Sequence, residues 1–210
     1  MAERTDIMQD YSSLSPAELR AKFRTGELVL PTAGLCPGYI QGNLVILHRR
    51  YGEDFLQFMK QNPKPCPILE VFDQGSPISH KMAEGADITT DIPLYRIYRN
   101  GVFEEEVKDV SGYWNEDMVG FLIGCSLTFE SRLVEAGIPL KHYEENKRVP
   151  MFDTNIACKP SKLFHGNYVV SMRPVKKELV DLAVKITEPM DYAHGAPVQI
   201  GDPDAIGIKD

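Results

Sequence analysis

The stretch LYRIYRNGVFEEEV, residues Leu94 to Val107, decides the fold class of this 210-residue chain. Its centre, Asn100-Gly101, is the dipeptide that most strongly favours a two-residue hairpin turn, because both residues tolerate positive φ. Aromatic and β-branched residues, typical of strands, flank the turn on both sides. We therefore predict an antiparallel hairpin, which excludes a pure alternation of parallel strands and helices.

Helical signals surround this hairpin. The run Ser15-Pro16-Ala17-Glu18 combines an N-cap serine, a proline at the first helical position and a capping-box glutamate, and Gly26 ends the helix. Apolar periodicity also predicts helices over 53–61, 117–123, 129–136 and 175–186, and strands over 68–72, 149–156 and 168–172, with 44–47 open to either assignment. The expected fold is α+β (mixed α/β), a mixed sheet with an antiparallel hairpin, flanked by helices.

Composition excludes several classes of partner. The net charge of −7 argues against nucleic acid, because phosphate contacts need clustered lysine and arginine. No apolar run reaches the roughly 18 residues of a membrane span. The first ten residues lack the apolar core of a signal peptide, so we expect a cytoplasmic protein.

The cysteines are widely spread and form no C-x-x-C pair, so neither a zinc site nor a disulfide framework is expected. They are Cys36, Cys66, Cys125 and Cys158. We interpret all four as reduced thiols.

Seven segments, in one order along the chain, resemble the D-glutamate cyclase family of hydro-lyases. They are TAGLCPGYIQGNL (32–44), NPKPCP (62–67), TDIPLYR (90–96), FLIGCSLTFE (121–130), VPMF (149–152), VVSMRP (169–174) and HGAPV (194–198). Two positions depart from the family's usual residues: Cys36 and His48 stand where alanine and proline are more common.

The resemblance implies one domain over residues 1–210, amino-acid metabolism, and closure of D-glutamate to 5-oxo-D-proline with loss of water. It implies no cofactor and no metal. Family members usually continue beyond the position of Asp210, so we expect the family's C-terminal tail, with any site residues in it, to be absent here.

Such a cyclisation requires a cation for a carboxylate, a base for the ammonium group, donors for the oxyanion and an acid that helps water leave. Arg173 and Arg96 are the candidate carboxylate clamps, because a guanidinium binds a carboxylate bidentately. Arg173 follows the predicted strand 168–172, and ligands tend to bind at the strand ends of open sheets. The alternative for both arginines is an ion pair within the protein.

The turn Gly124-Cys125-Ser126 is a candidate lining of the site, because glycine lets a ligand approach the backbone closely. Ser126 would contact the substrate or cap a helix. Cys125 would be a nucleophile or a small buried apolar side chain. Glu130 would be an acid or base if it lies in an apolar environment, and a surface residue otherwise.

The other candidates are polar residues in or beside loops. His194, in a Gly/Pro-rich loop, would be an acid or base, or would make structural hydrogen bonds. Substrate contacts or backbone capping are the two interpretations for Gln41, Asn43, Asn155 and Asp202.

Three functional hypotheses remain open from the sequence. The first is a hydro-lyase acting on a small acidic substrate resembling an amino acid. The second is an amidohydrolase in which Cys125 acts with His194, which would need a reactive thiol of low pKa. The third is a non-catalytic module that binds a small molecule. Homo-oligomerisation is left open.

Overall fold

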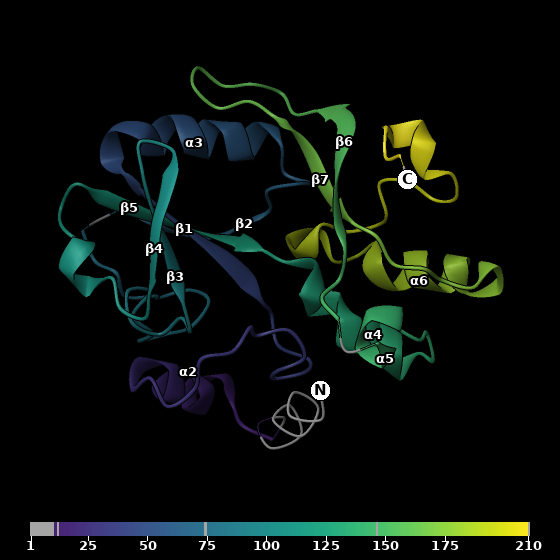
Figure 1. Ribbon diagram of the computed structural model, residues 1–210, viewed down its shortest axis with the longest axis horizontal. Helices are drawn as coiled ribbons and strands as arrows, with labels where there is room; N and C mark the ends of the chain where they lie inside the picture. The colour runs from purple at the N-terminus through teal and green to yellow at the C-terminus, as the bar shows by residue number, and fades with distance from the viewer. Residues whose placement is uncertain (1–10, 12, 74, 146, 210) are drawn as a thin grey trace.

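The computed structural model describes residues 11, 13–73, 75–145 and 147–209 (Figure 1). Helices and antiparallel strands are mixed along the chain, so the predicted α+β class is confirmed. The strands of this described part form three small antiparallel sheets, ordered β1-β5-β2, β3-β4 and β6-β7, in place of the mixed sheet that we expected. None of its helices is both long and apolar enough to cross a membrane.

The central sheet places β5 (Met118–Gly124) between β1 (Gly42–His48) and β2 (Ile68–Phe72). The helix predicted over 117–123 is therefore wrong, and this segment is the middle strand. An apolar run of seven residues is compatible with a buried strand and a buried helix alike, because periodicity alone does not separate them. The strand predicted at 68–72 is confirmed.

Helix α3 (Arg49–Gln61) covers this sheet and begins four residues before the predicted start. Met59 on α3 is fully buried and packs with Val119 and Phe121 of β5. This cluster is the core beneath the central sheet, and its aromatic contacts include an edge-on pair between Phe55 and Phe121. Burial of such large side chains supplies most of the driving force for this packing.

Helix α2 (Pro16–Arg24) has the predicted capping box, in which Ser15 and Glu18 satisfy each other's backbone N–H groups. The prediction for 129–136 corresponds to α4 (Glu130–Glu135), and that for 175–186 to α6 (Val180–Thr187). The remaining α-helix is α5 (Lys141–Glu144). Short 3-10 helices are η1 (Ser111–Tyr113), η2 (Ser126–Phe129), η3 (Lys177–Leu179), η4 (Asp191–Ala193) and η5 (Pro203–Ile206).

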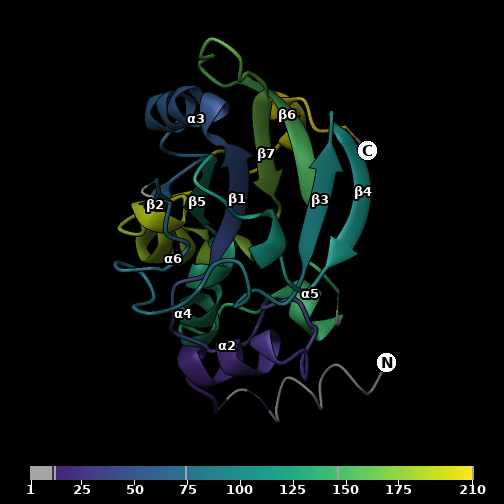
Figure 2. The same cartoon turned by 90° about the vertical axis from the view of Figure 1, so that its left-hand side faces the viewer.

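The hairpin that fixed the class consists of β3 (Tyr95–Arg99) and β4 (Val102–Val107). Its turn residues have positive φ, 49° at Asn100 and 78° at Gly101, as the sequence predicts. A second hairpin pairs β6 (Met151–Ala157) with β7 (Asn167–Ser171). Figures 1 and 2 show α2 below the first hairpin and α4 and α6 below the second.

The end of β5 at Gly124 is held by very close contacts. Its N–H donates to the carbonyl of Pro67 at 2.9 Å. A Cβ atom at this position would lie 1.7 Å from the carbonyl oxygen of Tyr192, which belongs to η4. Only glycine therefore fits here, and the close approach is made by the protein's own backbone.

We predict that Gly124→Ala destabilises the protein strongly, by about 3 kcal/mol or more, because backbone on both sides must move to admit the methyl group. The matched control is Gly112→Ala, since a Cβ there meets nothing within 4 Å. Urea denaturation of both variants measures the difference. Equal midpoints for the two alanine variants would contradict the packing at Gly124.

Candidate functional site

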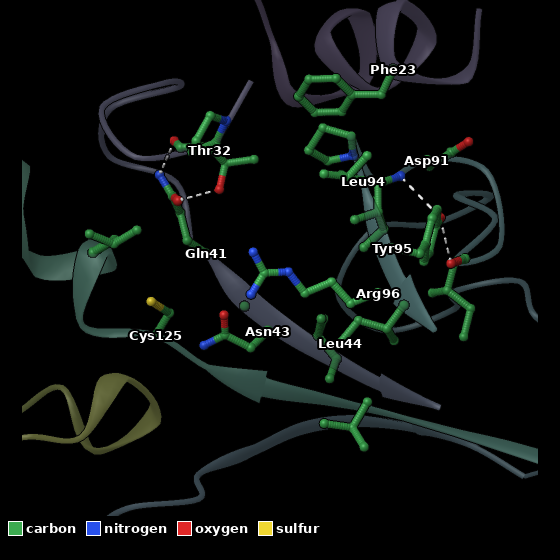
Figure 3. A pocket seen from close by; sticks show the side chains of 18 of the residues that line it. Phe23, Thr32, Gln41, Asn43, Leu44, Asp91, Leu94, Tyr95, Arg96 and Cys125 are labelled. Atoms are coloured by element: carbon green, nitrogen blue, oxygen red, sulfur yellow. Dashed lines mark hydrogen bonds between the residues drawn. The ribbon is translucent and has the colours of Figure 1, made fainter. Parts of the chain in front are cut away.

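An open cleft of about 1720 Å³ runs between α2, β1, the hairpin strand β3 and the segment that follows β5 (Figure 3). Five of the residues predicted from the sequence line it. They are Gln41, Asn43, Arg96, Cys125 and Ser126. The fold thus brings these five residues, which are up to 85 positions apart in the sequence, to the walls of one cleft.

Arg96 is one of the arginines that line this cleft. It rises from β3, and its terminal nitrogens point toward Asn43 and Cys125 (Figure 3). Its Nε donates to Glu106 Oε1 at 2.9 Å, and 62% of the side chain is exposed. An exposed pair of this kind contributes little to stability, so the guanidinium is available to a ligand.

The two amides of the cleft differ in their engagement. Gln41 accepts from Thr32 Oγ1 at 2.9 Å and donates to the carbonyls of Thr32 and Leu35, so its side chain fixes the preceding Pro/Gly loop (Figure 3). Asn43 is exposed, and its amide makes no hydrogen bond to any described residue. Of the two amides, Asn43 is therefore the one free to contact a substrate.

Behind Ser126 lies a buried ion pair between Glu130 and Arg173. Glu130 is fully buried, and its Oε1 accepts from Arg173 Nε at 3.0 Å and from Arg173 Nη2 at 2.6 Å. The same Nη2 donates to Ser126 Oγ at 3.0 Å. The guanidinium also stacks over the ring of Phe129, 5.0 Å from its centroid.

In this geometry Arg173 forms an ion pair with Glu130. An ion pair within the protein was the alternative to the role of Arg173 as a clamp for the substrate carboxylate. Arg173 is not among the residues that line the cleft, whereas Ser126 is. The hydroxyl of Ser126 accepts the bond from Arg173, so its own hydrogen remains free to be donated into the cleft. Of the two positions that the sequence left open for Glu130, the surface position is excluded, since the side chain is fully buried; its neighbours include the Arg173 guanidinium as well as apolar side chains.

His142 belongs to this cluster and was missed from the sequence. It lies on α5, lines the cleft and is 6% exposed. Its Nε2 is 3.1 Å from Glu130 Oε1, in a geometry that does not form a hydrogen bond. No local pattern relates positions 130 and 142, and His142 lies in none of the seven family segments, so only the tertiary fold reveals it.

The imidazole of His194 contacts backbone carbonyl groups. Its Nδ1 lies 2.9 Å from the carbonyl oxygen of Lys64, and Lys64 Nζ in turn donates to the carbonyls of His194 and Ala196. Burial lowers the pKa of His194. Its backbone has φ 77°, an uncommon value for a residue other than glycine. In the described residues no hydrogen bond joins His194 to Cys125.

Asn155 and Asp202 lie outside the cleft lining. Asp202 caps η5, with its side chain accepting from the N–H of Asp204 at 3.0 Å. Asn155 on β6 is exposed and packs beneath Gly207, just after η5. The structure thus gives Asp202 the capping role that was the alternative to substrate binding.

The four cysteines are free thiols. Burial, with Cys158 nearby, raises the pKa of Cys66 to about 11, and burial also raises the pKa of Cys36 and of Cys158. These three thiols are therefore poor nucleophiles near neutral pH. Across the described ranges, no three His, Cys, Asp or Glu side chains gather as ligands for a metal ion would.

Comparison with known proteins gives one consistent family. The family model described as D-glutamate cyclase matches residues 119–210. A protein of Thermoanaerobacter sp. (strain X514), named "Putative hydro-lyase", is 54% identical over 199 residues, which cover 95% of this chain and 75% of that protein. A Clostridium beijerinckii protein with the same general name is 50% identical over 201 residues, covering 96% and 77%.

We predict that Arg173→Met destabilises the protein by about 3–5 kcal/mol, because it leaves the Glu130 carboxylate buried without a cation. The matched control is Arg96→Met, which removes an arginine from an exposed ion pair and should change stability little. Thermal and urea denaturation measure both variants. A further Glu130→Leu change should restore part of the loss, and similar stabilities for the two single variants would refute the buried pair.

Proposed function

Because this chain belongs to the D-glutamate cyclase family, we propose that it is a hydro-lyase that closes D-glutamate to 5-oxo-D-proline with loss of water. The supporting observation is the arrangement of the cleft. Arg96 faces Asn43 and the turn that contains Ser126, and the buried Glu130–Arg173 pair lies directly behind Ser126. This arrangement supports a site in which a residue that could bind an anion lies beside groups that could transfer protons.

In this proposal Arg96 binds the α-carboxylate of the substrate. Its terminal nitrogens form the planar fork that matches a carboxylate. Asn43 offers both an amide donor and an acceptor next to it. The carboxylate clamp first predicted for Arg173 thus passes to Arg96, because Arg173 is occupied by Glu130.

The reaction forms a C–N bond when the amine attacks the γ-carbon and breaks a C–O bond when water leaves. Two protons pass from the ammonium group to the departing oxygen, which balances the step. The oxyanion formed at the γ-carbon needs a donor already in place. Ser126 supplies it, since its oxygen holds an N–H of Arg173 and its hydrogen points elsewhere.

Cys125 has no covalent role in this scheme, because the substrate's own amine is the nucleophile. The amidohydrolase hypothesis would need Cys125 to be activated by a base. His194, its proposed partner, is held by the carbonyl of Lys64. The arrangement of the described residues therefore favours the lyase over the amidohydrolase.

We predict that the full chain interconverts D-glutamate and 5-oxo-D-proline. Incubation with either compound, followed by chiral chromatography, measures the conversion, with L-glutamate as the stereochemical control. A ligand that raises the melting temperature without being converted would instead support the binding-module hypothesis. Absence of conversion in both directions would refute the proposed reaction.

We also predict that Cys125→Ser retains kcat within about tenfold, whereas Ser126→Ala lowers kcat by about 10²–10³-fold, the loss expected for one oxyanion donor. The two side chains are sequence neighbours that line the same cleft, so each variant is the control for the other. Steady-state kinetics on folded protein provide the comparison. A loss of about four orders of magnitude in Cys125→Ser would establish covalent catalysis.

A further inference from the structure

Two buried polar atoms of the described residues lack a hydrogen bond, and they are neighbours. These atoms are Glu130 Oε2 and His142 Nε2. A buried polar group without a partner costs about 1–3 kcal/mol, so folded proteins rarely retain one without a reason. The two atoms belong to different helices, and the distance from His142 Nε2 to the other oxygen of Glu130, Oε1, is 3.1 Å. Their lack of partners indicates a place for a polar atom from outside the protein chain.

The position of this pair connects it to the cleft. His142 lines the cleft wall, and Glu130 lies behind it with no exposed surface. Arg173 bonds Glu130 Oε1 and Ser126 Oγ, so one continuous set of contacts links Ser126, at the cleft, to His142. The unpartnered atoms are therefore part of the same site as the proposed oxyanion donor.

The charged and titratable groups around His142 come from several elements. Glu130 of α4 is the anion nearest to Nε2. Arg173, after β7, is the cation on the far side of Glu130. On its own helix the ring of Tyr143 packs edge-on at 4.8 Å. Lys147 and Arg148 line the cleft beyond α5, and Lys147 is paired with Glu145 at 2.8 Å.

We propose that His142 is the catalytic acid–base residue of this site and that Glu130 is its positioning residue, a role that rests on the lyase function proposed above. The imidazole Nε2 accepts a proton from the substrate ammonium as the C–N bond forms. It then returns that proton to the oxygen that leaves as the C–O bond breaks. The second proton takes the same route, so one imidazole moves both and ends unchanged.

Glu130 positions the imidazole through Oε1. This oxygen is fixed by Arg173 and lies 3.1 Å from His142 Nε2, so it sets the orientation of the ring. Oε2 has no hydrogen-bond partner among the described residues and no exposed surface, so Glu130 acts on the substrate through His142 and not by direct contact.

The experiment compares His142→Asn with wild type and with His165→Asn, which alters an exposed histidine in the loop between β6 and β7. His142→Asn should lower kcat by about 10²–10⁴-fold, the usual contribution of general acid–base catalysis. KM should change by less than about threefold if substrate recognition is left to Arg96. Imidazole added to His142→Ala should restore part of the rate, which a structural role would not allow.

The split between kcat and KM tests Glu130. Glu130→Gln should lower kcat while KM changes by less than about threefold, because the ring loses the carboxylate that orients it but substrate recognition is left to Arg96. If this variant proves unfolded, the same split is measured in Glu130→Asp, which keeps the charge but withdraws it from the ring.

Near-normal kcat in folded His142→Asn would overturn this inference while leaving the proposed function standing. A loss of kcat with no imidazole rescue would assign His142 a structural role and overturn the inference as well. Absence of turnover by wild type would overturn the function and the inference together.

Discussion

The buried ion pair between Glu130 and Arg173 is the constraint on which the site depends. A carboxylate with no exposed surface is very unfavourable unless a cation and hydrogen bonds accompany it. Satisfying it requires the start of α4 and the segment after β7 to meet, although they are 43 positions apart. Ser126 joins the same guanidinium, so the turn that opens onto the cleft is fixed by the pair beneath it. Apolar packing around Phe129, Leu133 and Met190 then closes the cluster from solvent.

The fold was predictable where its determinants are local. The Asn100-Gly101 turn and the Ser15–Glu18 capping box each lie within four residues, and both are as the sequence indicates. Strand β5 was not predictable from the sequence. A middle strand is covered on both faces and therefore lacks the alternation of polar and apolar residues that identifies a strand. Its two glycines carry the missed signal. A Cβ at Gly120 would lie 2.7 Å from Ile88, and Gly124 meets Tyr192, so both mark close packing that a helix of the same sequence would not need.

Several of the candidate residues chosen from the sequence lie together in the fold, whereas their contacts did not follow from the sequence. Arg96, Cys125 and Ser126 do meet at one cleft, and Glu130 and Arg173 lie just behind it. The sequence left each arginine with two roles, a substrate clamp or an ion pair. Only the fold shows which role suits which arginine, because the role depends on whether a protein carboxylate lies within about 3 Å of the guanidinium and is buried with it. His142 lay beyond such reasoning, since a single histidine on a four-residue helix produces no pattern.

The two arginines therefore occupy environments suited to different tasks. Arg96, with 62% of its side chain exposed, suits the proposed recognition of an anion from solvent, because water screens the contact and allows ready release. Arg173, at 11%, acts on charges that never leave the protein, where the lower local dielectric makes each interaction stronger. In the proposed reaction, which expels water, this division assigns recognition to the exposed Arg96 and proton transfer to His142, where the cleft borders the buried interior. The buried oxygen of Glu130 and nitrogen of His142 that lack hydrogen-bond partners among the described residues lie on this inner side of the site.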